Sequence, residues 1–295
     1  MENNPLVSVI CLCFNHQEYV IECLNSVLKQ DYPAIEIIIA DDCSTDNSRE
    51  MINKWLLENP TVMFIENESN LGNTKTFNKA LKQAKGEFVI DLATDDKLMP
   101  FCVSNQVAAF KNNALLHLGA VFGNAVNINE NGSFCSYYFP VDTNLKVIQE
   151  IKNGSIYSSI LAGSESMCSV SAMFKKSVFD ELQGYDESLA YEDLDFWIRA
   201  ARKYNFQFID QILVEKRILS NSMGTNFYKK NNKINYSTYK ILKKVKKLNK
   251  TKQENKAVLK RIHFEMKLNF KSKNYMLSLK YIFLELYFRL NLANV

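Results

Sequence analysis

Two pairs of neighbouring acidic side chains in this chain of 295 residues could do chemistry, Asp95-Asp96 and Glu192-Asp193. Asp95-Asp96 follows a short apolar run, and two adjacent carboxylates repel each other unless a cation lies beside them. Carboxylate oxygens suit Mg²⁺ or Mn²⁺, so this pair is a candidate metal site. Glu192-Asp193 stands directly before an amphipathic segment, where a helix dipole can keep a carboxylate ionised as a general base. Helix capping is the competing interpretation of both pairs.

A third acidic pair, Asp41-Asp42, also follows an apolar run. A carboxylate in this position can accept a hydrogen bond from the imide N–H of a uracil or thymine base. We therefore expect Asp42 to contact a base, and we expect Ser44 and Asp46 to cap the helix that follows.

Apolar runs alternate with helical patterns over the first hundred residues. Strands are predicted over 6–13, 35–40, 62–65 and 87–93, with a helix between each pair. This β-α alternation predicts an α/β, Rossmann-like, mostly parallel sheet with helices on both faces. Ligands of such sheets lie beyond the carboxyl ends of the strands, which is where the pairs at 41–42 and 95–96 fall.

The common sequence motifs for binding nucleotide phosphates are absent. No GxGxxG follows the first strand, which disfavours a dinucleotide site, and no GxxxxGK[ST] occurs, which excludes a P-loop. A nucleotidyltransferase would need a Gly-rich loop after the first strand, where this chain has CFNHQE. A parallel sheet whose strand ends carry Asp pairs must then hold phosphate by another route, and a divalent metal held by carboxylates is the natural one.

The second part of the chain is less regular. Strands are predicted over 120–128, 168–174 and 206–214, and helices over 178–182 and 194–204. No low-complexity linker separates it from the first part. We therefore expect residues 1–104 and 105–225 to form two halves of one continuous catalytic unit.

Residues 226–295 form a basic, helical C-terminal extension with 18 Lys and Arg against 3 Asp and Glu. Their net charge of +15 leaves −11 on residues 1–225 and indicates an anionic partner. The segment 275–290 is aromatic and apolar but too short and charged to span a bilayer. An anionic membrane surface, packing on the body, or a homodimer would each explain it, and membrane contact is slightly favoured.

The N-terminus MENNPLVSV lacks the features of a signal peptide. The seven cysteines are odd in number and include no CxxC pair, so buried free thiols in a reducing compartment are expected. We predict a cytoplasmic protein, with peripheral contact to the inner face of the membrane as the open alternative. No nucleic-acid partner is expected.

The motifs taken together resemble the family 2 glycosyltransferases of the GT-A fold. The matching segments are VSVICLCFN, IIIADDCSTDNS, NLGNTKTFNKAL, GEFVIDLATDDKLMP and GYDESLAYEDLDFWIRAARKY, over about residues 5–222. The resemblance implies an inverting transfer of a sugar from a nucleotide-diphosphate donor, with UDP- or dTDP-sugars favoured, to a glycan or lipid-linked acceptor in surface polysaccharide synthesis. It also implies Mn²⁺ or Mg²⁺ as cofactor. By the same resemblance, residues 1–104 would be the nucleotide-sugar-binding half and residues 105–225 the acceptor-binding half of one catalytic domain.

The same resemblance assigns roles to individual residues. The metal ligands would be Asp96 and, less directly, Asp95. Asp193 would be the catalytic base, with Glu192 in reserve. The residues implied for donor binding are Phe14, Asn15, Asp42, Lys75 and Asp95.

Three positions depart from the family pattern. Ala93 stands where an Asp is common, Phe77 where an Arg is frequent, and Leu219 where a His often ends the conserved region. These departures leave an alternative function open, a catalytically weak binding or scaffold subunit of a glycan-assembly complex.

Overall fold

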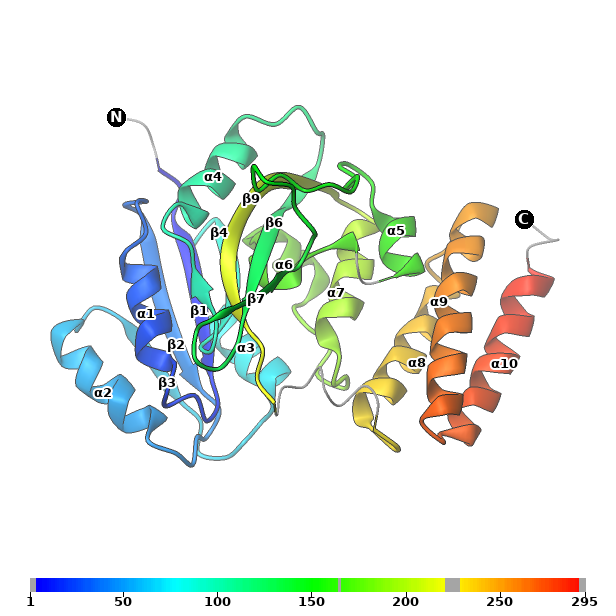
Figure 1. The fold of residues 1–295 in the computed structure, drawn as a ribbon, viewed down its shortest axis with the longest axis horizontal. Coiled ribbons are helices and arrows are strands. Elements are labelled where there is room, and N and C mark those ends of the chain that lie inside the picture. The colour runs from blue at the N-terminus through cyan, green and yellow to red at the C-terminus, as the bar shows by residue number, and fades with distance from the viewer. Residues whose placement is uncertain (1–3, 164–165, 221–228, 292–295) are drawn as a thin grey trace. The chain divides into compact units, whose positions relative to one another are not determined.

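The computed structural model describes residues 4–163, 166–220 and 229–291 (Figure 1). It consists of two compact units that are interleaved along the chain. The sheet unit contains residues 1–154, 168–185 and 205–218, and the helical unit contains 155–167, 186–204 and 219–295. The predicted division at residues 105 and 226 concerns function and stays a prediction.

Among the described residues, the sheet unit carries one nine-stranded sheet with the order β3-β2-β1-β4-β8-β6-β9-β5, and β7 pairs with β6. Its strands are β1 Val7–Cys13, β2 Ile35–Asp41, β3 Met63–Glu66, β4 Phe88–Ala93, β5 Lys97–Leu98, β6 Leu118–Ile128, β7 Phe134–Tyr137, β8 Met173–Lys175 and β9 Asn205–Arg217. Its helices are α1 Val20–Leu28, α2 Ser48–Glu58, α3 Asn73–Leu81, α4 Cys102–Lys111 and α6 Lys176–Leu182.

The strands β3, β2, β1 and β4 are parallel, which confirms the α/β, mostly parallel sheet. Every residue of β1 is buried, as expected for a strand covered on both faces. Helix α1 buries Val20, Cys23, Leu24 and Val27, the i, i+3, i+4, i+7 spacing of one helical face. Burial of these apolar side chains holds the helix against the sheet.

The prediction of a strand over 168–174 is wrong for the first half of this segment. Ser169–Ser171 forms a turn of 3₁₀ helix, and the strand β8 begins only at Met173. The Ser171 hydroxyl donates to the carbonyl of Gly123 at 2.8 Å and accepts from its N–H at 3.1 Å. This side chain takes the place of a backbone partner, so the local backbone leaves the strand conformation.

The helical unit consists of α5 Tyr157–Ala162, α7 Glu192–Ala201, α8 Lys233–Val245, α9 Lys252–Lys271 and α10 Tyr275–Leu290. Helix α9 begins with a reciprocal capping box between Thr251 and Glu254. Helix α10 matches the predicted segment 275–290. Across the described ranges, no helix combines the length and apolar character needed to cross a membrane.

Candidate active site

The carboxyl ends of β1, β2 and β4 meet at one edge of the sheet. Cys13 pairs with Asp41 on β2, and Leu12 pairs with Ala93 on β4. The residues that follow these strands therefore come together, as the alternation of strands and helices predicts. They include Phe14-Asn15, Asp42 and Asp95-Asp96.

Asp96 lies in a tight turn directly after β4 and is only 4% exposed. Its backbone N–H donates to the carbonyl of Ala93 at 3.0 Å. Its Oδ1 accepts the backbone N–H of Arg217 at 2.7 Å. The end of strand β9 thus fixes one oxygen of the Asp96 carboxylate.

The Arg217 guanidinium holds the backbone of the same turn. Its Nε donates to the carbonyl of Asp95 at 3.1 Å, and its Nη1 donates to the carbonyls of Asn129 and Glu130. Its Nη2 binds Glu22 at 2.8 Å. Arg217 supports this turn, and sequence reasoning assigned it no role because these partners lie far away along the chain.

Burial, and then the negative charge of Asp95, raise the pKa of Asp96 from its usual 3.8 to about 8. At neutral pH the metal-free carboxyl therefore keeps a proton that the unfolded chain has lost. Two carboxylates completed by substrate phosphates suit the coordination that Mg²⁺ adopts in proteins. The Asp95-Asp96 turn fits such a cation, although the described ranges contain no cluster of three His, Cys, Asp or Glu that could hold one.

This raised pKa predicts a pH dependence. Because the folded state binds the proton more tightly, the metal-free protein should lose stability as pH rises from about 4 to about 8. A cation that binds Asp96 must displace the same proton. Mn²⁺ should therefore raise the melting temperature more at pH 8.5 than at pH 6. These pH values lie about half a unit above and about two units below the pKa of Asp96. Thermal unfolding with Mn²⁺ or EDTA at both pH values tests this. An equal shift at the two pH values would contradict it.

His16 is a second residue that sequence reasoning did not assign. Its Nδ1 lies 2.9 Å from the hydroxyl oxygen of Thr94 and 3.9 Å from Oδ1 of Asp95. It lies in the loop after β1, at the same sheet edge as the acidic turn. A His within such a loop is the signal that could have identified it.

Asp42 is buried and accepts four hydrogen bonds within the sheet unit. Its Oδ1 accepts from Asn67, the N–H of Leu71 and the hydroxyl of Thr76, at 2.7–3.1 Å. Its Oδ2 accepts from the N–H of Gly72 at 2.8 Å. Asp42 therefore organises the loop between β3 and α3, and Oδ2 retains the greater capacity to accept a bond from a base.

Asp42→Asn should lower the free energy of unfolding by about 1–3 kcal/mol. In either orientation, the new amide NH₂ would face the N–H of Leu71 or of Gly72, so donors would meet donors. Urea denaturation measures the change. Glu68→Gln, in the same loop but exposed, is the matched control and should stay within about 0.5 kcal/mol. Equal stabilities of both variants would refute this role of Asp42.

Asn15 adopts a left-handed backbone conformation with φ of 58°, which Asn tolerates better than most residues. Its N–H donates to Ser44 at 2.9 Å, and its Oδ1 accepts the N–H of Thr45 at 2.8 Å. The side chain thus joins the loops after β1 and β2. The neighbouring Phe14 is 43% exposed, which leaves its ring accessible for stacking.

Helix α3 carries Lys75, which was predicted to bind the donor, and Phe77, which departs from the family pattern. Lys75 is exposed in its first turn. Phe77 is fully buried, with ring centroids 5.3 Å from Phe179 and 4.5 Å from Tyr185. The position where an Arg is frequent in the family thus contributes here to the apolar core.

Glu192 and Asp193 lie in the helical unit, whereas the other predicted site residues lie in the sheet unit. Both occupy the first turn of α7, where Glu192 is buried and Asp193 is partly exposed. Lys244 of α8 holds α7 in place, because the Nζ of Lys244 binds Asp195 on α7 at 2.7 Å and Asp186 at 2.5 Å. The C-terminal helices therefore support the element that carries Asp193.

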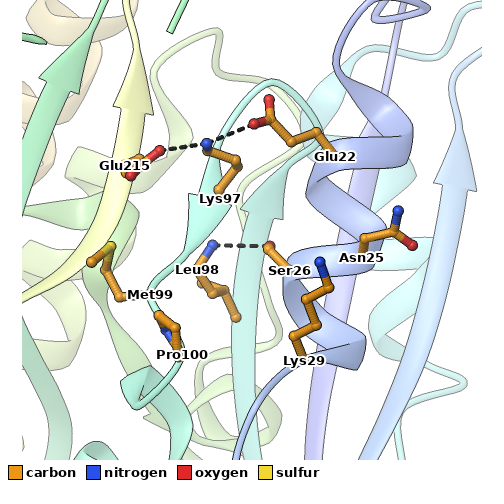
Figure 2. A pocket seen from close by; sticks show the side chains of 9 residues that line it. All are labelled: Glu22, Asn25, Ser26, Lys29, Lys97, Leu98, Met99, Pro100 and Glu215. Carbon is orange, nitrogen blue, oxygen red and sulfur yellow. Dashed lines mark hydrogen bonds and ion pairs between the residues drawn. The ribbon is translucent and has the colours of Figure 1, made fainter. Parts of the chain in front are cut away.

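A groove of about 330 Å³ opens between α1, β5 and β9 (Figure 2). Figure 2 shows Lys97 between two carboxylates, Glu22 at 2.6 Å and Glu215 at 2.5 Å. Because Glu22 also binds Arg217, it connects the groove to the support of the acidic turn. The lining residues are Glu22, Asn25, Ser26, Lys29, Lys97, Leu98, Met99, Pro100 and Glu215.

Comparison with known protein sequences finds glycosyltransferases. An uncharacterized glycosyltransferase of Methanocaldococcus jannaschii is 29% identical, over 83% of this chain and 82% of its own length. The poly(ribitol-phosphate) β-N-acetylglucosaminyltransferase TarS of Staphylococcus aureus is 42% identical over 30% of this chain and 16% of its own length.

Solved structures share the fold. TarS residues 1–349 in complex with UDP-GlcNAc match with a TM-score of 0.68 and 20% identity, over 93% of this chain and 76% of that one. The mannosyltransferase PcManGT of Pyrobaculum calidifontis, in complex with GDP-Man and Mn²⁺, matches with a TM-score of 0.63 and 17% identity, over 96% and 74%. The model of glycosyl transferase family 2 matches residues 8–183. The chain is therefore a glycosyltransferase and belongs to family 2.

Proposed function

We propose that this glycosyltransferase moves a sugar, with inversion, from a nucleotide-diphosphate donor to a glycan or lipid-linked glycan in surface polysaccharide synthesis. The observation that carries the proposal is the Asp95-Asp96 turn, with buried Asp96 at the carboxyl edge of the parallel strands. UDP- and dTDP-sugars are the favoured donors. The nucleotide sugar bound to TarS and the polymer in that protein's name support this donor and acceptor class.

In the proposed reaction, Asp193 takes the proton of the acceptor hydroxyl, and the resulting oxygen attacks the anomeric carbon. The bond from that carbon to the diphosphate oxygen breaks, and the nucleoside diphosphate leaves with the electron pair. Mn²⁺ or Mg²⁺, when bound, would supply positive charge to the diphosphate. Asp96 is the proposed ligand, and Asp95 the second carboxylate beside it.

The donor's base would stack near Phe14 and accept or donate bonds at the edge formed by Asn15 and Asp42. The exposed Lys75 is the proposed cation nearest the phosphates. These roles rest on position within the family pattern and on the shared sheet edge. We further propose that the protein acts in the cytoplasm.

A catalytically weak scaffold subunit is the second candidate. Ala93 favours it, because this exposed position at the end of β4 offers no third carboxylate. Phe77 favours it as well, since its ring is committed to the core.

Turnover separates the two candidates. The wild-type protein should be incubated with Mn²⁺, a panel of nucleotide sugars and a glycan acceptor library, and nucleoside diphosphate release should be followed. Release of UDP or dTDP, with a product whose anomeric configuration is inverted in its NMR spectrum, would support the enzyme. Donor binding without release on any acceptor would favour the scaffold.

A further inference from the structure

Helix α10 presents an exposed apolar face that the proposed reaction does not use. Met276, Phe283 and Leu290 are 65–70% exposed. At about 100° per residue, the exposed apolar side chains cover one continuous arc of roughly 140°. Large exposed apolar patches mark interaction surfaces. This set, called the α10 face, consists of Tyr275, Met276, Leu279, Ile282, Phe283, Leu286, Tyr287 and Leu290.

The opposite side of α10 is already covered within the helical unit. Leu277, Tyr281, Leu284 and Phe288 are at most 3% exposed. The Tyr281 ring packs edge-on against Tyr239 of α8, with ring centroids 5.4 Å apart. The helix is therefore apolar around most of its circumference, which is typical of a helix covered on both sides. The α10 face is the side that still needs a partner.

Cations border the α10 face. Lys280 and Arg289 fall at the two edges of the arc. The Nζ of Lys246 lies 3.7 Å from the ring centroid of Tyr287. Lys280 also lies 5.6 Å from the ring centroid of Tyr236 on α8. Helix α8 and the turn that follows it expose four lysines and one tyrosine in a row, called the α8 stripe, which consists of Lys233, Tyr236, Lys240, Lys243 and Lys247.

The few acidic side chains in residues 229–291 are committed to other cations. Glu254 binds Arg202 at 2.5 Å, and Glu265 binds Arg261 at 3.0 Å. Glu285 binds Arg289 at 2.6 Å. The lysines of the α8 stripe therefore keep their positive charge available to an external anion.

We propose that the α10 face and the α8 stripe together dock on a lipid bilayer with anionic headgroups. The apolar side chains would enter the interfacial region, and the lysines would reach the headgroups along their flexible stems. Tyr275 and Tyr287 suit the same depth, where amphipathic rings are enriched. Docking of this kind is independent of which sugar the enzyme transfers.

A second copy of the chain is a poorer occupant of the same surface. A two-fold interface that covers both the α10 face and the α8 stripe puts a second copy of the same basic surface against the lysines. Lysines would then lose water while facing lysines, which disfavours association. An anionic bilayer instead satisfies the charge and the apolar area with one partner.

Co-sedimentation of the full chain with vesicles tests the proposal. The wild type should bind vesicles of phosphatidylcholine with about 30% phosphatidylglycerol, and it should bind pure phosphatidylcholine at least about tenfold more weakly. Raising the salt from about 0.1 M to about 0.5 M should release it. Phe283→Ser with Leu286→Ser, both on the exposed side, should weaken binding by about tenfold or more.

Matched variants separate the two parts of the surface. Lys240→Gln with Lys243→Gln should weaken binding to the anionic vesicles by about tenfold and leave the apolar contribution intact. Leu57→Ser, at an 82% exposed position outside the α10 face, should change nothing. Circular dichroism and donor turnover of each variant verify folding.

Two outcomes would overturn the proposal. One is equal sedimentation of the wild type and the Phe283→Ser, Leu286→Ser variant. The other is a wild-type dimer in light scattering that ignores vesicles and becomes monomeric in that variant, which would assign the α10 face to a second copy. Failure of vesicle binding with normal turnover would leave the proposed reaction standing.

Discussion

Asp193→Asn is expected to lower the rate of sugar transfer by about 10²- to 10⁴-fold while leaving donor affinity within a factor of about two. The amide cannot take the proton of the acceptor hydroxyl, but it keeps the size of the side chain and its place in the first turn of α7. Initial rates of nucleoside diphosphate release at saturating donor, with a calorimetric titration of the donor, measure the two effects separately.

Two companion variants make this result specific. Glu192→Gln removes the buried neighbour in the same turn, and we expect a smaller loss of activity. Asp180→Asn alters an exposed carboxylate on α6 that pairs with Lys176 and should have no effect. Full activity of Asp193→Asn would refute its role as base, and loss confined to Glu192→Gln would transfer that role to Glu192.

The second large effect is expected for Asp96→Asn, which should weaken metal-dependent donor binding by about 10²-fold or more. The substitution removes the carboxylate oxygen that would face the cation, while the oxygen of the amide can still accept the N–H of Arg217. Calorimetric titration of the donor with Mn²⁺ present measures the loss.

Unfolding cannot account for this loss if the metal-free variant is as stable as the wild type. Because the pKa of Asp96 is raised to about 8, the wild type carries an unfavourable buried charge above that pH, and the neutral amide does not. The variant should therefore match or exceed the wild type in urea stability at about pH 9. Asp95→Asn is the matched comparison and should cost less donor affinity. Unchanged Mn²⁺-dependent binding by Asp96→Asn would contradict its role as ligand.

The sheet edge was predictable because the strands that form it are continuous apolar runs. Every residue of Val7–Cys13 is buried, as are four of the six residues of Phe88–Ala93, so the ends of these strands could be predicted from the pattern of residues alone. Parallel pairing then brings those ends together. The family resemblance and the GT-A fold followed from motifs at those ends, and both are confirmed.

The support of the site was not predictable, because it depends on contacts between distant segments. Arg217 reaches the Asp95 carbonyl across more than a hundred residues, and the local sequence does not reveal that contact. Asp42 gains three of its donors from the loop between β3 and α3 and the fourth from Thr76 on α3. The prediction that Asp42 binds a base did not take into account that these four donors already occupy its carboxylate oxygens.

The attachment of the helices in the helical unit was likewise not predictable from the sequence. Its C-terminal helices were predicted from spacing, but their attachment to α7 depends on Lys244 binding Asp186 and Asp195. Ser171 misled the strand prediction because an alternating pattern does not reveal a side chain that replaces a backbone partner. The features that could not be predicted from the sequence therefore depend on polar contacts between residues far apart along the chain.

Equilibrium titration of the wild-type protein with a nucleotide-sugar panel tests the central claim most directly, with each titration run in Mn²⁺ and again in EDTA. We predict that at least one UDP- or dTDP-sugar binds in Mn²⁺ and that EDTA weakens its binding by about tenfold or more. Binding of equal strength in Mn²⁺ and EDTA, or no binding of any donor in either, would contradict a metal-assisted donor site at Asp95-Asp96.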